Sequence, residues 1–368
     1  MAQPAKNNFG HWWWKILGAI LLLGASITAL RTPLEPALVH VSPDRVGAGP
    51  VDLTITGYNT SFSDQYQVYF INGDQRICAS SISSGAANKL SAHFDIPGGV
   101  KANLSSIVVH HPDEGRLGMP NAIFHTSTGE GTITLSCAEA PANAIGSGEF
   151  SFPDRNILYE TIRNLNFHVP MWFTMMTLMA ISLGYSIKNL GSKDLAHDRS
   201  AAVAVHIGLL FCGLGLATGA VWARSTWGAW WTNDVKLNGA AVTALIYLAY
   251  LVLRGSITEP FRRARLASVY NIFAFMLLVL FLLVLPRMNT VDSLHPGSGG
   301  NPAFNQYDLD DDLRLVFYPA VAGWILLGIW MFQLRDRAKR LQNRLADRDQ
   351  PLLRSAGRPI VFKKIQGI

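Results

Sequence analysis

The chain has 368 residues, of which 49% are hydrophobic and 15% are charged, with a formal net charge of +6. This composition is unusual for a soluble globular protein and favours a membrane protein. The positive charge comes from segments beside long apolar runs. It therefore reports membrane orientation and argues against nucleic acid as a partner.

Six segments are long and apolar enough to cross a bilayer, which takes about 20 residues for ~30 Å of hydrocarbon. The first is expected to be an uncleaved anchor, because no small-x-small cleavage site follows its apolar core. The predicted spans are Trp12–Leu30, Pro170–Ile187, Ala201–Val221, Leu237–Leu253, Val269–Leu285 and Leu315–Leu334.

Basic residues near the ends of the spans set the expected orientation, because they are retained on the cytoplasmic side. They mark the N-terminus, the loops around 188–199 and 254–265, and the tail from Arg335, whereas the segment 287–314 contains five aspartates. The pattern predicts a multi-pass protein of the cytoplasmic membrane with both termini in the cytoplasm. The segments 31–168 and 287–314 then lie outside.

The long external segment reads as a β-domain, with short alternating runs separated by Gly, Pro, Asn and Asp. Its opening, VSPDRVGAGPVDLTITGYNTSF, resembles the first strands of Ig-like IPT/TIG domains, which bind or position partners or act as spacers. The spacing suits a small sandwich. The expected strands are Val51–Gly57, Gln67–Ile71, Lys89–Asp95, Ser105–His110 and Ala122–Thr126.

The expected fold is an all-α polytopic membrane protein with six transmembrane helices and an inserted all-β sandwich outside the membrane. We expect four parts: a cytoplasmic start with the first helix (1–35), the periplasmic β-sandwich (36–150), a five-helix membrane domain (151–335) and a basic cytoplasmic tail (336–368). Cys78 and Cys137 both fall in the β-domain, where a disulfide between them can persist, whereas Cys212 lies in the third span.

A Trp-rich loop (222–236) follows the third span, with Trp222, Trp227, Trp230 and Trp231 inside ten residues. An interfacial aromatic belt is one explanation. The neighbouring Asp234 and Lys236 favour another explanation, a platform for a flat, apolar ligand that carries carboxylates.

The stretch GAVWARSTWGAWWTNDVKLN resembles the WWD signature of the CcmC/CcsA haem-handling proteins, Trp-Gly-x-Trp-Trp-x-Trp-Asp-x-Arg-Leu-Thr. The chain keeps Trp227, Gly228, Trp230, Trp231, Asp234 and Leu237. It has Asn233 for the last Trp, Lys236 for Arg and Asn238 for Thr. The Asn233 departure removes one stacking surface.

Two histidines extend the resemblance, because CcmC-type members place one before the second span and one between the fifth and sixth. Here these are His168, in NFHVPMWF, and His295, in NTVDSLHPG. The resemblance implies haem b as the cofactor, with both histidines as axial ligands of its iron. Trp222, Trp227, Trp230 and Trp231 would surround the porphyrin, Lys236, Arg224 or Arg287 would pair with the propionates, and Asp234 would orient the loop or a basic neighbour.

The resemblance further implies a non-enzymatic role in cytochrome c maturation at the outer face of the bacterial inner membrane. The haem would pass to a CcmE-like periplasmic chaperone, with CcmA/CcmB-like ABC components as partners. One alternative is a CcsA-like lyase that attaches haem to apocytochrome c and would need further ligands inside the membrane. Another is a membrane-anchored adaptor that uses its sandwich domain.

Three further features have simpler structural explanations. His206, in the third span, is expected to pair within the helical bundle. His110 and His111 are strand neighbours that point to opposite faces, so we do not expect them to share a metal. Gly215 and Gly219 form a Gly-x-x-x-Gly pattern that indicates close helix packing.

Overall fold

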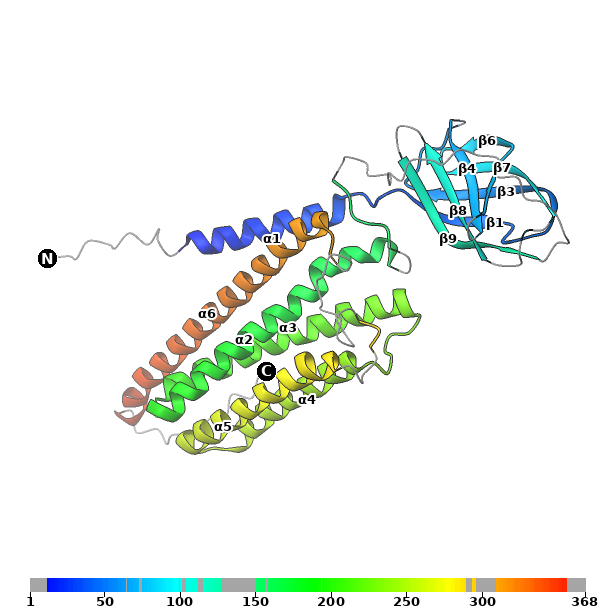
Figure 1. Ribbon diagram of the computed structural model, residues 1–368. Helices are drawn as coiled ribbons and strands as arrows, with labels where there is room; N and C mark the ends of the chain where they lie inside the picture. Colours follow the sequence, from blue (N-terminus) through cyan, green and yellow to red (C-terminus); the bar gives the residue numbers. More distant parts are fainter. Residues whose placement is uncertain are drawn as a thin grey trace. The chain divides into compact units, whose positions relative to one another are not determined.

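A computed structural model describes residues 12–355, except 64, 73–74, 99, 101–103, 112–114, 127–149, 156–157, 193, 289–292 and 296–308. The chain forms two compact units (Figure 1). A β unit lies within Arg31–Glu160, and the chain on either side of it forms a helical unit.

The helical unit contains six helices that are long and apolar enough to cross a membrane, which confirms the predicted fold class. The helices are α1 (Trp13–Arg31), α2 (Leu165–Ser192), α3 (Leu195–Trp227), α4 (Val235–Ser256), α5 (Pro260–Val279) and α6 (Asp311–Ser355). A 3-10 turn, η2 (Tyr159–Asn164), leads into helix α2. Helix α5 continues through a π turn, η3 (Leu280–Val284), and a 3-10 turn, η4 (Leu285–Arg287).

Carboxylates cap the starts of four helices in the described residues, as the unpaired N–H groups there require. Asp194, Asp234, Glu259 and Asp310 accept backbone hydrogen bonds at the starts of α3, α4, α5 and α6. The α3 helix ends at Gly228, whose φ of 76° is a left-handed value that favours glycine. Trp222 and Trp227 therefore lie on α3, and the connecting loop begins only after them.

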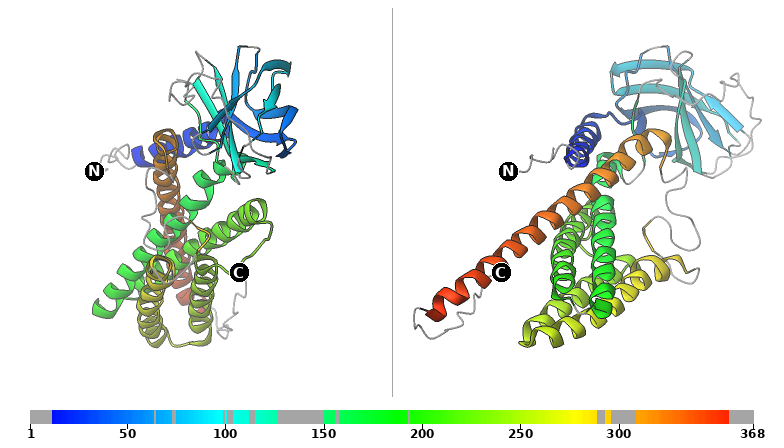
Figure 2. Two further views of the ribbon diagram at one scale, coloured as in Figure 1. Left: turned by 45° about the vertical axis from the view of Figure 1, so that its right-hand side comes forward. Right: turned by 90° about the vertical axis from the view of Figure 1, so that its left-hand side faces the viewer.

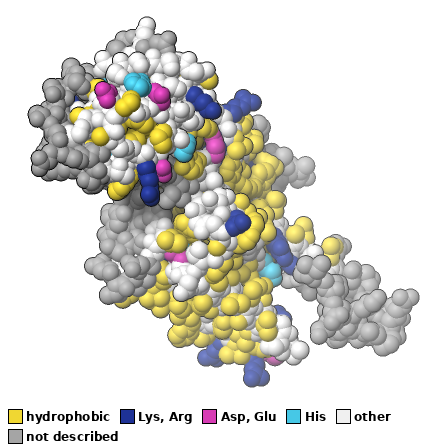
Figure 3. Space-filling view, turned by 90° about the vertical axis from the view of Figure 1, so that its right-hand side faces the viewer, with side chains coloured by type: hydrophobic (Ala, Val, Ile, Leu, Met, Phe, Trp, Pro, Cys, Tyr) yellow, Lys and Arg dark blue, Asp and Glu magenta, His cyan; other side chains and the backbone are white. Residues whose placement is uncertain are grey.

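The helices pack through apolar and small polar side chains. The Asn271 amide donates to the Ser182 and Ser186 hydroxyls of α2 at 2.7 and 2.8 Å, which is typical of polar bonding between membrane helices. Figure 2 shows α2 and α3 side by side at the centre of the unit. Hydrophobic side chains cover much of its surface in Figure 3, and Val252 and Phe273 are 73% and 68% exposed, as lipid contact requires.

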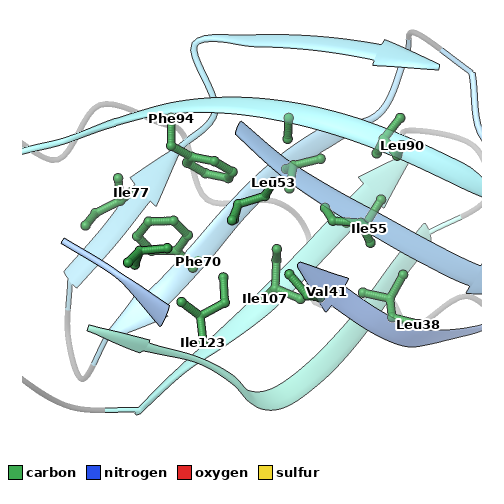
Figure 4. Close-up of a cluster of buried hydrophobic side chains, with 14 of the residues drawn as sticks. Leu38, Val41, Leu53, Ile55, Phe70, Ile77, Leu90, Phe94, Ile107 and Ile123 are labelled. Atoms are coloured by element: carbon green, nitrogen blue, oxygen red, sulfur yellow. The ribbon is translucent and has the colours of Figure 1, made fainter. Parts of the chain in front are cut away.

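The β unit is a sandwich of two sheets, with strand orders β1-β3-β7-β6 and β2-β9-β8-β4-β5. Its core lies between the sheets, where Phe70 stacks on Phe94 with ring centroids 4.6 Å apart (Figure 4). The strands are β1 (Ala37–Ser42), β2 (Arg45–Val46), β3 (Gly49–Tyr58), β4 (Gln67–Asn72), β5 (Gln75–Cys78), β6 (Ser81–Ala86), β7 (Lys89–Ile96), β8 (Leu104–His111) and β9 (Gly115–His125).

All five predicted strands coincide with observed ones, and the sequence analysis missed β1, β2, β5 and β6. The β6 segment, SISSGA, lacks the apolar alternation that signals a strand, and its pairing with β7 holds it in the sheet. Cys78 is disulfide-bonded and Cys212 is free and buried. Cys137 lies outside the described residues, so its pairing with Cys78 stays a prediction.

Candidate functional site

His168 lies in the first turn of α2, against two glycines of α3. A Cβ atom at Gly219 would come within 2.7 Å of the His168 ring, and one at Gly215 within 2.9 Å of the Trp172 ring. The Gly-x-x-x-Gly pattern therefore forms a notch that receives an imidazole and an indole from the neighbouring helix. Packing of this closeness fixes the position of the His168 ring.

Hydrogen bonds determine which nitrogen of His168 carries the proton. The Thr218 hydroxyl donates to the Leu214 carbonyl at 2.8 Å, so its oxygen accepts from His168 Nδ1 at 3.1 Å. His168 Nε2 is then unprotonated and accepts from Trp172 Nε1 at 3.3 Å. A donor bond from one imidazole nitrogen is how proteins orient the other nitrogen toward a metal.

Trp222 stands on the other side of His168. Their ring centroids are 5.7 Å apart with nearly perpendicular planes, and the indole donates to the Thr161 hydroxyl at 3.1 Å. His168 is thus flanked by an indole from α2 and another from α3. The surroundings are apolar and aromatic, which suits a large flat ligand.

His295 is held by Asp234, far from it in sequence. Its Nδ1 lies 3.0 Å from Asp234 Oδ1, and the Trp227 ring lies against the imidazole with centroids 5.0 Å apart. The carboxylate holds the proton on Nδ1, so Nε2 is the unprotonated nitrogen of the neutral imidazole. The carboxylate–histidine pair is a common way to orient a metal ligand.

The Asp234 carboxylate is 2% exposed and serves two segments at once. Oδ1 accepts from the Lys236 N–H at 2.8 Å at the start of α4. Oδ2 accepts from the Ser293 hydroxyl at 2.7 Å and from the Leu294 N–H at 2.8 Å. Burial alone would raise the pKa of Asp234, but the hydrogen bonds from His295 and Ser293 outweigh it and bring the pKa below its ordinary range.

The two histidines lie at the same end of the helical unit. Trp222, which contacts His168, and Trp227, which contacts His295, are five residues apart on α3, about 7.5 Å along the helix. The two histidines therefore lie near one another although 127 positions separate them in the sequence. The start of α2, the end of α3, the start of α4 and the segment after η4 all contribute to this end. We call His168, Trp222, Trp227, Asp234 and His295 the histidine site.

The remaining tryptophans of the predicted loop are exposed, Trp230 by 61% and Trp231 by 45%. The Trp231 indole donates to Asn238 Oδ1 at 3.2 Å, and the Asn238 amide donates to Asn233 Oδ1 at 2.8 Å. Asn233 thus anchors a short hydrogen-bond chain that ends on an exposed aromatic face.

The predicted cationic residues have local partners. Arg224 donates to the Gly228 carbonyl at the end of α3, and Arg287 donates to the Leu283 carbonyl at 3.0 Å. Lys236 lies in the first turn of α4, directly after Asp234. All three residues are close in the sequence to residues of the histidine site. Their pairing with propionates stays a prediction.

Other candidate histidines lie elsewhere. His206 donates through Nδ1 to the Ala202 carbonyl of its own helix at 2.7 Å, and His110 donates to the Gly115 carbonyl at 3.1 Å. Within the described residues, no group of three or more His, Cys, Asp or Glu side chains is placed to hold a metal ion.

Sequence reasoning identified the histidines and tryptophans but missed their supports. Thr218 and Ser293 belong to no motif that names them, and only the pairing of α2 with α3 and of α4 with the 293–295 segment reveals their role. The Gly-x-x-x-Gly pattern was the one signal that pointed toward the notch.

The notch can be tested by adding one methyl group. Gly219→Ala should displace the His168 ring and destabilise the protein by about 1–3 kcal/mol, the usual cost of overpacking. Gly213→Ala is the matched control, because nothing lies within 4 Å of a Cβ at that position on the same helix. Thermal unfolding in detergent and the NMR signals of the His168 ring measure both effects, and equal behaviour of the two variants would contradict the notch.

The Asp234 carboxylate should give a defined acid dependence. Because its folded pKa is lowered, its contribution to stability is complete above the unfolded value of about 4 and is lost as the pH falls through the lower folded value. Asp234→Asn keeps a helix-capping side chain but removes the charge. The gap in melting temperature between wild type and variant should be constant from pH 8 to pH 5 and shrink below pH 4. A gap that grows on acidification would contradict this assignment.

Comparison with known proteins places this arrangement in a family. A family model described as "Heme exporter protein C" matches residues 124–350. A protein of that name from Bradyrhizobium diazoefficiens is 32% identical over 113 residues, covering 30% of this chain and 43% of the relative. The one from Paracoccus denitrificans is 25% identical, covering 50% and 76%. A "Cytochrome c biogenesis protein CcsA" from Prochlorococcus marinus is 41% identical over 18% of this chain and 21% of the relative. Since the family model covers more than half of its length, the chain belongs to the haem exporter protein C (CcmC) family.

Proposed function

We propose that this protein binds haem b at the outer face of the bacterial inner membrane and hands it to a periplasmic haem chaperone during cytochrome c maturation. His168 and His295 are the axial ligands of the iron. The observation that carries the proposal is that the two imidazoles are hydrogen-bonded in the same way. Each donates from Nδ1 to an oxygen, so Nε2 is the nitrogen that would coordinate iron. In His168 this nitrogen accepts from the Trp172 indole, and iron would take the place of that hydrogen bond.

The residues present suit haem in size and chemistry. Trp222 and Trp227 each lie edge-on to one of the histidines, and Trp230 and Trp231 are exposed in the segment between α3 and α4. Indoles stack on the flat apolar porphyrin. Arg224, Lys236 and Arg287 are close to these residues in the sequence and would pair with the two propionates.

The two imidazoles are held by different kinds of contact, which supports a role in transfer. The ring of His168 is packed between helices in the glycine notch, whereas that of His295 depends on the Asp234 carboxylate and the Trp227 ring. A partner that displaces the His295 imidazole would free one coordination position of the iron while His168 stays bound to it. The protein thus acts as a binding and transfer factor, in which haem is the cargo rather than a redox centre.

The orientation follows from the basic residues. Both termini are cytoplasmic and the β unit is periplasmic, since Lys and Arg accumulate at the opposite membrane side from the histidine site. A CcmE-like chaperone receives the haem on the periplasmic side, and CcmA/CcmB-like ABC components complete the machinery, as family membership suggests.

Haem lyase activity is the second candidate, because part of the chain resembles a CcsA protein. Such an activity would call for further haem ligands within the membrane. Within the predicted third span Ala201–Val221, the described histidine is His206, which bonds through Nδ1 to its own helix at 2.7 Å. One histidine is poor support for several further ligands, so the transfer function is favoured.

The axial ligands can be tested by spectroscopy of the purified, haem-loaded protein. His168→Ala and His295→Ala should each convert a low-spin six-coordinate spectrum into a high-spin one, because each variant removes one strong-field nitrogen ligand. His206→Ala is the matched control and should leave the spectrum unchanged. An unchanged low-spin spectrum in either of the first two variants would remove that histidine as a ligand.

A protein with no Soret absorbance after expression with ample haem would overturn the proposed function as a whole.

To test hand-off, haem-loaded protein is mixed with a purified CcmE-like chaperone, and the haem is followed by separating the two proteins. We expect transfer to be faster for His295→Ala than for wild type, because one ligand is already gone. Equal rates would contradict the displacement step.

A further inference from the structure

The last helix extends well past the membrane. At 1.5 Å per residue, the apolar segment Leu315–Leu334 covers about 30 Å, the thickness of the hydrocarbon. Leu341 and Leu345 then lie about 10 and 16 Å further along the same helix, whereas the headgroups add only about 5–8 Å. Figure 2 shows α6 as one continuous helix whose end lies apart from α2–α5. Both leucines are thus in water rather than in lipid.

One face of this extension carries an apolar stripe. Leu334, Ala338, Leu341 and Leu345 follow each other at intervals of four, three and four residues, the spacing of one helix face. Leu334 lies at the edge of the hydrocarbon and Ala338 at headgroup depth, so Leu341 and Leu345 are the part of the stripe in water. All four are exposed, and Leu341 and Leu345 are each 58% exposed. A stripe of this kind in water normally packs against another surface.

The helix already uses its opposite face within the protein. Asp336 is 4% exposed and accepts from the Ser200 hydroxyl of α3 at 2.8 Å. Helical geometry places the stripe roughly 140–200° around the axis from Asp336. The stripe therefore points away from α3, and the contact with α3 leaves it uncovered.

Charge identifies the kind of surface that fits the stripe. Arg337 and Arg344 border it on one side and Arg335 on the other. Residues 334–346 contain five basic residues and one acidic residue, and that acidic residue, Asp336, is already paired with Arg340. Two copies of such a helix repel each other, whereas an acidic surface with an apolar centre is complementary to it.

We propose that the stripe and its arginines form a docking site for a separate protein that presents an acidic amphipathic helix on this side of the membrane. The leucines supply apolar contact, and the arginines select the charge of the partner. This inference is independent of haem binding at the other end of the helices.

The test uses the full-length protein in zwitterionic nanodiscs and a fluorescent helical peptide with leucines along one face and glutamates beside them. We expect Leu341→Ala with Leu345→Ala to weaken binding at least tenfold, and alanine keeps the helix intact. Arg337→Glu with Arg344→Glu should weaken it similarly and create binding to the lysine version of the peptide. Asn343→Ala, on the Asp336 side of the helix, is the matched control and should change nothing.

Three results would overturn the proposal. One is binding that survives the loss of both leucines, which would reduce the site to a basic helix. Another is self-association through the stripe, seen as pairs of the protein by mass photometry that disappear in the double leucine variant. The third is burial of a spin label placed by Leu345→Cys in phosphatidylglycerol nanodiscs, which would assign the stripe to lipid.

Discussion

The Asp234 carboxylate is the constraint on which the histidine site depends. A buried carboxylate is costly unless its oxygens are satisfied, and here they are satisfied by the start of α4 and by Ser293, Leu294 and His295. The same carboxylate therefore caps α4 and fixes the imidazole of His295, which lies in the segment after η4. Loss of its charge would affect both the position of the His295 ring and the start of α4.

His168 is positioned by shape rather than by charge. The absence of side chains at Gly215 and Gly219 lets α2 approach α3, and the polar contact with Thr218 then selects the tautomer. The two halves of the site thus rest on different physical effects, close packing for one and a charge-assisted hydrogen bond for the other. Acidification that protonates Asp234 should perturb the His295 half without loosening the His168 half.

The sequence revealed the framework of the protein because its signals are strong and local. A run of about 20 apolar residues allows few structures other than a spanning helix, and the Trp-Gly-x-Trp-Trp pattern with two histidines predicted the residues of the candidate site. What it could not reveal depends on contacts between distant segments. Nothing in the local sequence of Ser293 or Thr218 shows that it will bond to Asp234 or to His168. The replacement of the last family tryptophan by Asn233 removes an aromatic face, and the structure shows its amide engaged with Asn238, another departure from the family pattern.

The contact between α1 and α6 has a consequence for biosynthesis. A Cβ on Gly323 would come within 2.8 Å of the Leu22 backbone, and one on Gly18 within 2.9 Å of Leu326, so the first and last helices are in close contact. At about 5–20 residues per second, the ribosome needs roughly 15–60 s to make the chain between them. During that time α1 sits in the bilayer without this partner, and the contact forms only after α6 has been made. A chain truncated before α6 therefore lacks the helix that packs against Gly18 and Leu22.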